Sequence, residues 1–357
     1  MAPISIRLDR VSKRFDHTVK GEVYAVRDVS LAVSEGELLT LLGPSGCGKS
    51  TTLRMIAGFE EPDAGTISID GKDVTHVLPN KRGIGFVFQN YALFPHLTVF
   101  ENVAYGLRVQ GRDEAAITKA VGEVLELVGL TNYGQQQPHQ LSGGEQQRVA
   151  LARAVVFQPK VLLFDEPLSN LDAKLRVEMR EQIRSLQKRI GITTVYVTHD
   201  QEEAMAISDR IAVMERGAVV QDGTAHELYY RPATEFVARF IGRTNLVNAR
   251  VVSADDVEVE GARIGLASGL AAGATVQLVV RPEMIELTPA GAGQAGAGVI
   301  AQRTFLGEKT DYQVTLGSAT LQVSATDHYR KAPLEVGQPV AVRFHPEGIH
   351  VLKQLLI

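Results

Sequence analysis

A glycine-rich segment at residues 43–50, with the sequence Gly-Pro-Ser-Gly-Cys-Gly-Lys-Ser, constrains the fold of this chain more than any other feature. It fits the pattern G-x-x-x-x-G-K-S/T at every fixed position. The apolar segment 36–42 before it is typical of a buried strand, and segment 51–57 is typical of a helix that ends at Gly58. A strand, a glycine-rich turn and a helix in this order predict a phosphate-binding loop in an α/β fold, and this context argues against a chance glycine turn.

The loop residues can be assigned from the chemistry of phosphate binding. Glycines let successive backbone N–H groups converge on phosphate oxygens, and the helix N-terminus adds a partial positive charge. Lys49 is expected to reach the β- and γ-phosphates of ATP, and the Ser50 hydroxyl is expected to ligate Mg²⁺. The residues expected to hold the nucleotide here are Gly43, Pro44, Ser45, Gly46, Cys47, Gly48, Lys49, Ser50 and Thr51.

Two adjacent carboxylates follow the short apolar segment 161–164, which is compatible with a buried strand. Because side chains alternate along a strand, Asp165 and Glu166 are expected to point in different directions. We assign Asp165 as a Mg²⁺ ligand and Glu166 as the base that activates water. The sequence Asp-Glu-Pro alone is more often a solvated turn, but its combination with a phosphate loop favours the catalytic interpretation.

Two further polar residues end strand-like segments. His199 follows segment 193–198 and can donate a hydrogen bond to the γ-phosphate, although an isolated histidine is more often structural. Gln89 follows segment 84–88, and its amide can contact the metal or the water. Open parallel sheets gather ligands at the carboxyl ends of their strands, so these residues are expected to lie near the loop.

Residues 141–148, Leu-Ser-Gly-Gly-Glu-Gln-Gln-Arg, resemble the signature motif LSGGQ of ATP-binding-cassette (ABC) ATPases. The order of motifs also resembles that family: the Walker A loop, the Q-loop at Gln89, the signature, the Walker B strand, the D-loop at 169–172 and the switch at His199. The resemblance covers about residues 4–240. It implies a P-loop NTPase cassette over 1–240, with a RecA-like core and a helical subdomain at about 90–157.

The signature segment is also a helix start in its own right. Ser142 and Glu145 have the spacing of a capping box, which predicts a helix that continues to about residue 156. The resemblance implies that Ser142, Gly143 and Gly144 face the γ-phosphate held by a second copy of the chain, so that two chains sandwich two ATP molecules head to tail. It also assigns Asp172 of the D-loop to the nucleotide site. Glu145 departs from the usual glutamine and adds a negative charge.

Two assignments near the nucleotide depend on local environment. The resemblance implies that an aromatic residue stacks on adenine, and Phe15 and Tyr24 are rival candidates for it; Phe15 in the core is the alternative. Cys47 lies near a helix N-terminus, where the pKa of a thiol tends to fall. We therefore expect thiol alkylation to inhibit ATP hydrolysis and MgATP to slow the alkylation.

Composition limits the location and the partners. No segment approaches the eighteen or so apolar residues of a membrane span, and the N-terminus lacks a signal segment. A single cysteine in 357 residues excludes an internal disulfide and is typical of a reducing cytosol. The net charge of −4 argues against a nucleic-acid-binding surface. We expect a peripheral protein on the cytoplasmic face of the membrane.

The region 241–357 has a different character. Short β-type segments alternate with glycine and proline turns, which predicts a small barrel, and segment 290–298 is expected to be a flexible connector. A cassette with such a region resembles the ATPases of the maltose-, spermidine-, iron- and sulfate-type importers, which carry an OB-like (TOBE-type) regulatory region. The segments 281–283 and 305–307 lie where that group has similar short motifs.

The resemblance implies the ATP-hydrolysing subunit of an importer. Its implied partners are two membrane permease subunits and, indirectly, an extracytoplasmic solute-binding protein. Tyr91, Leu93 and Phe94 are expected either to line a groove for a permease helix or to belong to the core. The solute stays open among sugar, polyamine, ferric iron, phosphonate and sulfate. The alternative is a soluble ABC-type ATPase in translation or DNA maintenance, which the single cassette and the lack of sustained heptads disfavour.

Overall fold

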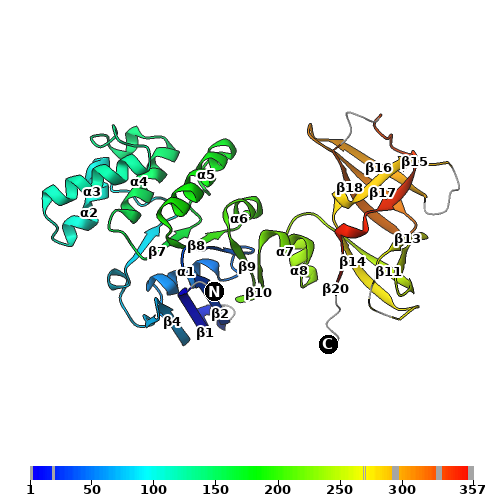
Figure 1. The fold of residues 1–357 in the computed structure, drawn as a ribbon, viewed down its shortest axis with the longest axis horizontal. Helices are drawn as coiled ribbons and strands as arrows, with labels where there is room; N and C mark the ends of the chain where they lie inside the picture. The colour runs from blue at the N-terminus through cyan, green and yellow to red at the C-terminus, as the bar shows by residue number, and fades with distance from the viewer. Residues whose placement is uncertain are drawn as a thin grey trace. The chain divides into compact units, whose positions relative to one another are not determined.

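The computed structural model describes residues 3–17, 21–267, 269, 271–291, 297–326 and 332–352. The chain divides into two compact units, residues 1–225 and 226–357, and each is described by itself (Figure 1). The division falls before the expected boundary at 240/241, because the short helices α7 (Ala225–Tyr230) and α8 (Glu235–Phe240) are tied to the second unit. The buried Arg281 guanidinium donates hydrogen bonds to the carbonyl oxygens of Tyr229 and Ala238.

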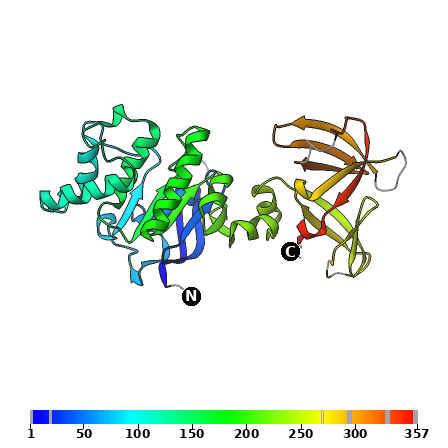
Figure 2. The same ribbon diagram turned by 45° about the horizontal axis from the view of Figure 1, so that its top comes forward.

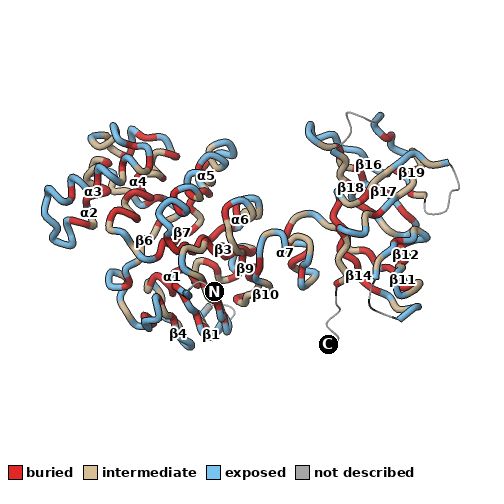
Figure 3. Tube along the Cα trace, in the orientation of Figure 1, coloured by how far each residue is buried: buried red, intermediate tan, exposed pale blue. Residues whose placement is uncertain are grey.

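The centre of the first unit is a six-stranded sheet with the order β10-β9-β3-β8-β7-β6. All neighbouring strands are parallel except β10, which forms an antiparallel hairpin with β9. Every residue of β3, β7 and β8 is buried, as expected for parallel strands covered on both faces (Figure 3). The strands are β3 (Leu38–Leu42), β6 (Ile84–Val87), β7 (Val161–Asp165), β8 (Thr193–Thr198), β9 (Arg210–Glu215) and β10 (Ala218–Gly223).

An antiparallel sheet with the order β2-β1-β4-β5 packs beside this core (Figure 2). Its strands are β1 (Ile4–His17), β2 (Gly21–Ser34), β4 (Ala64–Ile69) and β5 (Lys72–Asp73). Alternating residues of β1 and β2, such as Ile6, Leu8 and Leu31, join the hydrophobic core that also contains α1 (Lys49–Ala57). The same pair of strands therefore has one face in the core and the other available to solvent.

Three helices form a subdomain with its own core within residues 90–157 (Figure 1). These are α2 (Val99–Val109), α3 (Glu114–Leu127) and α4 (Gly143–Val155). Val103, Val121 and Val149 contribute one buried side chain each to that core. The long helix α5 (Ala173–Ile190) and the short α6 (Gln201–Ile207) complete the first unit, together with the 3₁₀ turns Pro79–Lys81 and Pro138–Gln140.

Besides α7 and α8, the second unit contains two five-stranded antiparallel sheets around a shared hydrophobic core. Their orders are β13-β12-β11-β14-β20 and β15-β19-β16-β17-β18. The strands are β11 (Asn245–Ser253), β12 (Asp256–Val259), β13 (Ala262–Gly265), β14 (Thr275–Val280), β15 (Ile285–Pro289), β16 (Ala297–Phe305), β17 (Thr310–Leu316), β18 (Ala319–Ala325), β19 (Pro339–Phe344) and β20 (Ile349–Leu352). The predicted strands are present, and the connector expected at 290–298 lies largely outside the described residues. No helix in the described ranges is long and apolar enough to cross a bilayer.

Candidate functional site

The predicted site residues follow strands that are neighbours in the parallel sheet. The loop 43–48 follows β3, His199 follows β8, Asp165 ends β7, and Gln89 lies two residues after β6. Strands β3, β8, β7 and β6 are consecutive in the sheet order. Parallel strands bring their carboxyl ends to one edge, so the topology places these residues along the same edge, as predicted.

The phosphate loop is a tight turn whose lysine is held in place by the loop itself. Lys49 is only 5% exposed, and its Nζ donates hydrogen bonds to the carbonyl oxygens of Gly43 (2.8 Å) and Pro44 (3.0 Å). Gly48 has a φ of +103°, and a Cβ at this position would clash with the Ala25 carbonyl oxygen. Only glycine fits this turn, which leaves the N-terminus of α1 open to an anion.

Ser50 and Asp165 meet across the sheet edge. The Ser50 hydroxyl donates a hydrogen bond of 2.8 Å to Oδ1 of Asp165. A hydroxyl and a carboxylate oxygen at this distance are the hard oxygen donors that Mg²⁺ prefers. Among the described residues no group of three or more His, Cys, Asp or Glu side chains gathers as a metal cage. The pair therefore fits a magnesium ion that takes its remaining ligands from water and nucleotide phosphates.

Glu166 and His199 form a second pair beside Asp165. Oε2 of Glu166 lies 3.2 Å from Nδ1 of His199, from the neighbouring strand β8. The backbone of Glu166 is left-handed, with a φ of +45°, which is uncommon for a residue other than glycine. A cavity of about 40 Å³, lined by both side chains and by Arg176, is large enough for a water molecule. This arrangement can orient a water beside a carboxylate base.

The D-loop connects these residues to Gln89. The Asn170 amide donates a hydrogen bond of 3.0 Å to the carbonyl oxygen of Gln89, while Gln89 itself is exposed. Asp172 serves as the N-cap of α5, because its carboxylate accepts a hydrogen bond of 2.9 Å from the Leu175 N–H. The role of Asp172 at the nucleotide stays a prediction. The Asn170 contact has no signal in the sequence, since the two residues are far apart along the chain.

The signature turn forms the predicted capping box at the start of α4. Oε2 of Glu145 accepts hydrogen bonds of 2.7 Å from both the N–H and the hydroxyl of Ser142. These hydrogen bonds, the Ser142 hydroxyl first, lower the pKa of the Glu145 carboxyl. A Cβ on Gly144 would lie 2.9 Å from Leu175, so the turn packs closely against α5. These contacts do not involve the phosphate loop of the same chain.

Both adenine candidates present their rings to solvent. Phe15 is 43% exposed and Tyr24 is 46% exposed, which excludes Phe15 as a core residue. The register pairs Tyr24 with Arg14 and Phe15 with Val23, so the two rings project from opposite faces of the β1–β2 ribbon. Each ring already lies under a cationic side chain, Lys13 for Phe15 and Arg14 for Tyr24. The choice between them stays open.

The predicted low pKa of Cys47 is wrong. The side chain is only 5% exposed, and this burial raises the pKa of the thiol, while the charge of Lys49 opposes the shift. The sequence argument considered the helix N-terminus, but a thiolate must also be solvated. The buried position outweighs both favourable effects.

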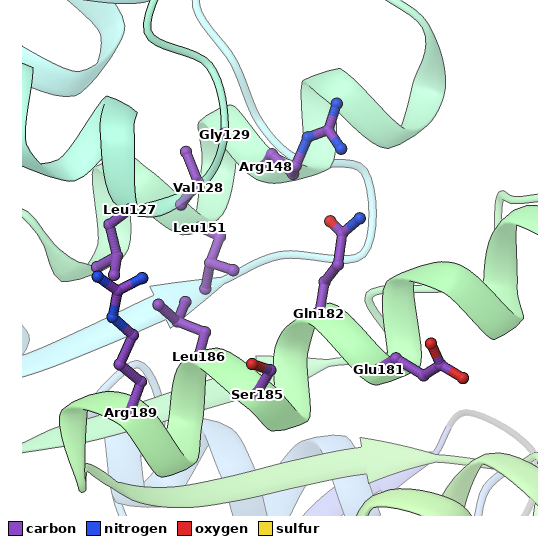
Figure 4. A pocket seen from close by; sticks show the side chains of 10 residues that line it. All are labelled: Leu127, Val128, Gly129, Arg148, Leu151, Glu181, Gln182, Ser185, Leu186 and Arg189. Atoms are coloured by element: carbon purple, nitrogen blue, oxygen red, sulfur yellow. The ribbon is translucent and has the colours of Figure 1, made fainter.

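The apolar segment after Gln89 divides between core and surface. Tyr91 is buried in the core between β7 and α5, whereas Leu93 and Phe94 are half-buried. A separate cavity of about 390 Å³ lies among the end of α3, α4 and α5, and Leu127, Leu151 and Leu186 line its apolar side (Figure 4). None of the residues predicted to bind ATP or Mg²⁺ lines this cavity.

Comparison with known proteins agrees with this geometry over nearly the whole chain. Residues 26–169 match the ABC transporter family, and residues 278–352 match the TOBE domain. The chain is 44% identical to the Fe(3+) ions import ATP-binding protein FbpC of Brucella abortus, with 99% of each chain covered. It is 47% identical to the spermidine/putrescine import ATP-binding protein PotA of Rubrobacter xylanophilus, with 95% of this chain and 91% of the relative covered.

The chain belongs to the ABC transporter ATP-binding proteins. Its cassette is also similar to the solved ATP-binding cassette MJ0796 in a dimeric post-hydrolysis state bound to ADP and Pi, with a TM-score of 0.54 and 34% identity. That match covers 61% of this chain and 98% of the solved one. The predicted family and the fold class, a P-loop cassette followed by a β-rich TOBE domain, are confirmed. The protein is an ABC ATPase.

Proposed function

We propose that this ABC ATPase is the motor of an import system and hydrolyses MgATP at the carboxyl edge of its parallel sheet. The observation that carries the proposal is the pairing of Ser50 with Asp165 beside the pairing of Glu166 with His199. Ser50 lies in the first turn of α1, Asp165 ends β7, Glu166 follows it, and His199 follows β8. Their positions match the needs of phosphate binding, metal binding and water activation in one place.

Each residue then has a distinct task. Lys49 leaves its loop carbonyls to contact the β- and γ-phosphates, while the backbone N–H groups of residues 43–51 hold the remaining oxygens. Ser50 and Asp165, with Gln89 nearby, would hold Mg²⁺, which neutralises charge on the phosphates when bound. Glu166 accepts a proton from the attacking water. His199, whose Nδ1 lies 3.2 Å from Glu166, would donate a ring N–H to the γ-phosphate.

ABC ATPase cassettes form dimers, and we propose that this chain forms a head-to-tail pair around two ATP molecules. Ser142, Gly143 and Gly144 begin α4, whose open N-terminus is an anion site. In the pair this site of one protomer faces the γ-phosphate on its partner. ATP then contacts both protomers only in the closed state, and hydrolysis releases that state.

The proposed partners and location follow from the relatives. Import ATP-binding subunits work with permeases, and we propose two permease subunits, with an extracytoplasmic solute-binding protein acting through them. The chain would then lie on the cytoplasmic face of the membrane. Relatives at 44% and 47% identity are named for Fe(3+) and for spermidine/putrescine. Because the two names differ, we propose no single solute, and the candidate solutes named above stay open.

Protein concentration provides the test. Phosphate release per chain should rise with protein concentration until the pair is saturated, because one protomer owns only half of each proposed site. Light scattering of Glu166→Gln with MgATP should give the molar mass of a dimer, and ADP should not produce that dimer. A rate per chain that is constant down to fully monomeric dilution would contradict the proposal. Co-purification with ribosomes or DNA instead of membrane subunits would favour the soluble alternative.

A further inference from the structure

The segment after Gln89 contains an unusual backbone conformation. Tyr91 and Ala92 are consecutive non-glycine residues with positive φ, at +60° and +49°. Single residues in this region are uncommon, and strained residues persist only when the surroundings hold them. The Tyr91 hydroxyl is also buried without a hydrogen-bond partner among the described residues. Other contacts must therefore hold this turn.

Two backbone hydrogen bonds, from the Tyr91 N–H to Phe88 and from the Ala92 N–H to Asn90, belong to the turn itself, and Arg153 of α4 adds contacts from outside it. Its two terminal nitrogens donate hydrogen bonds to the carbonyl oxygens of Ala92 (2.6 Å) and Tyr91 (2.8 Å). The same guanidinium lies 5.7 Å from the centre of the Phe94 ring. A planar guanidinium presents several N–H donors in a fixed fork together with a flat face, so it fits two carbonyls and an aromatic ring better than the ammonium of a lysine does. Arg153 therefore holds the left-handed turn at both of its residues.

The two ends of segment 89–98 are held by other elements. At its start, the D-loop residue Asn170 binds the Gln89 carbonyl oxygen. At its end, the fully buried Asn102 of α2 accepts from the Phe94 N–H and donates to the carbonyl oxygens of Phe94, Leu97 and Thr98. Arg153 therefore provides the side-chain hydrogen bonds between the middle of this segment and α4, beside the packing of Tyr91 in the core that α4 shares.

Helix α4 carries the signature turn at its other end. Arg153 lies about three turns, or about 16 Å, along α4 from its N-cap Ser142. A helix moves as a rigid element, so a displacement of the signature turn also displaces the Arg153 guanidinium. Left-handed non-glycine residues persist only while surrounding contacts hold them, so a displaced guanidinium would allow the turn at 91–92 to relax.

We propose that Arg153 is a positioning residue that ties the backbone of segment 89–94 to the signature helix. When the signature turn engages the partner's ATP, Arg153 re-aims Gln89 toward the hydrolytic site together with the half-buried Leu93 and Phe94. This inference rests on the proposed head-to-tail pair. It adds a mechanical connection between the turn that senses the partner and the segment that follows Gln89.

The test uses the full-length chain with Arg153→Met, Arg153→Lys and the control Arg108→Met. Arg108 is an arginine of the same helical subdomain whose hydrogen bonds go to Glu114 at the surface. Arg153→Met should lower kcat for ATP hydrolysis by about tenfold and change KM for ATP by less than about twofold, because the phosphate loop is intact. Arg153→Lys should recover part of kcat, and Arg108→Met should match wild type.

Hydrogen exchange gives an independent readout. In the Glu166→Gln background, MgATP should change the exchange of amides in residues 89–98, and adding Arg153→Met should remove that change while light scattering still detects the dimer. A merely structural arginine would lower thermal stability without this split. If Arg153→Met fails to fold, the same exchange measurement on Arg153→Lys tests the inference.

The outcomes separate the two proposals. Wild-type kcat in both Arg153 variants, or an ATP-dependent exchange change that survives in them, overturns this inference alone. Absence of an MgATP-dependent dimer in Glu166→Gln itself overturns the proposed function instead. A parallel loss in Arg108→Met would also contradict the inference, since that residue does not contact segment 89–94.

Discussion

The phosphate-loop edge and the signature turn both offer a helix N-terminus to an anion, yet their polar groups are arranged differently. At the sheet edge, side chains from different strands contact one another, as Ser50 and Asp165 do. At the signature turn, Ser142 bonds to Glu145 three residues later in the same turn. The first site is assembled by the fold. The second is a local structure whose Ser142 is exposed, and its hydrogen bonds with Glu145 stay within the turn.

In the proposed head-to-tail pair, this difference indicates which groups the second protomer would supply. Long-range topology gathers the groups proposed to bind phosphate, metal and water within one chain. The capped turn instead packs on Leu171 through Gly143 and on α5 through Gly144, and its capping hydrogen bonds stay within the turn. Lesions at the two regions should therefore fail in different ways, and the predictions below use that contrast.

The largest effect is expected for Glu166→Gln. Loss of the water-activating base should lower kcat by about a thousandfold and leave ATP binding intact. Phosphate release and equilibrium ATP binding measure the two quantities separately. Glu181→Gln, on the exposed face of α5, is the matched control and should retain full activity. A Glu166→Gln protein that hydrolyses ATP at the wild-type rate would contradict the assignment of Glu166 as the water-activating base.

The second prediction mixes lesions from the two regions. Lys49→Ala and Ser142→Ala should each lower the rate by about a hundredfold, the first through phosphate contacts and the second through the partner's ATP. A one-to-one mixture should recover about one quarter of the wild-type rate, because mixed pairs contain one intact composite site. A mixture no more active than its components would show that the two regions do not complement across protomers.

Cys47 tests the environment of the phosphate loop. Since burial raises the pKa of this thiol, its alkylation near pH 7 should be slower than that of a free thiol, and the rate should keep rising above the usual thiol pKa. Alkylation should inhibit hydrolysis, and MgATP should slow it. It is the only cysteine in the sequence, so the loss of label in Cys47→Ala provides the baseline. Rapid labelling at neutral pH would contradict a buried thiol.

The smallest effect concerns the charge of the signature turn. Glu145→Gln should tighten the ATP-driven dimer by about twofold to fivefold, because a negative charge near the partner's triphosphate is removed while the cap is kept. The effect should shrink at high salt, where exposed charges are screened. Dimer affinity in the Glu166→Gln background, measured at low and high salt, is the test. If Glu145→Gln leaves the dimer affinity unchanged at both low and high salt, the prediction is refuted.

The sequence predicted the sheet edge well because motif and topology constrain each other. A strand that ends in Asp165 is expected to lie parallel to the strand before the phosphate loop. The parallel order then brings His199 and Gln89 to the same edge. The capping box at Ser142 was also predictable, since it depends on residues three positions apart. These features are local, or they follow from strand ends.

Other features were out of reach because they depend on distant contacts. Arg153 binds carbonyl oxygens more than sixty residues away, and nothing in its helical neighbourhood marks it. The pKa of Cys47 was wrongly predicted because burial comes from the tertiary fold around the loop. Arg281 was noted only as part of a short motif, and its hold on α7 and α8 explains why they group with the β-rich unit.

The exposed rings of Phe15 and Tyr24 bear on which nucleotides the protein can use. A flat ring offers its face to any purine, and stacking alone does not distinguish an amino group from a keto group on the base. If one of these rings stacks on the base, we expect GTP and ITP to support hydrolysis at rates close to that with ATP. Nucleotide preference inside a cell would then reflect which triphosphate is abundant rather than what the protein reads.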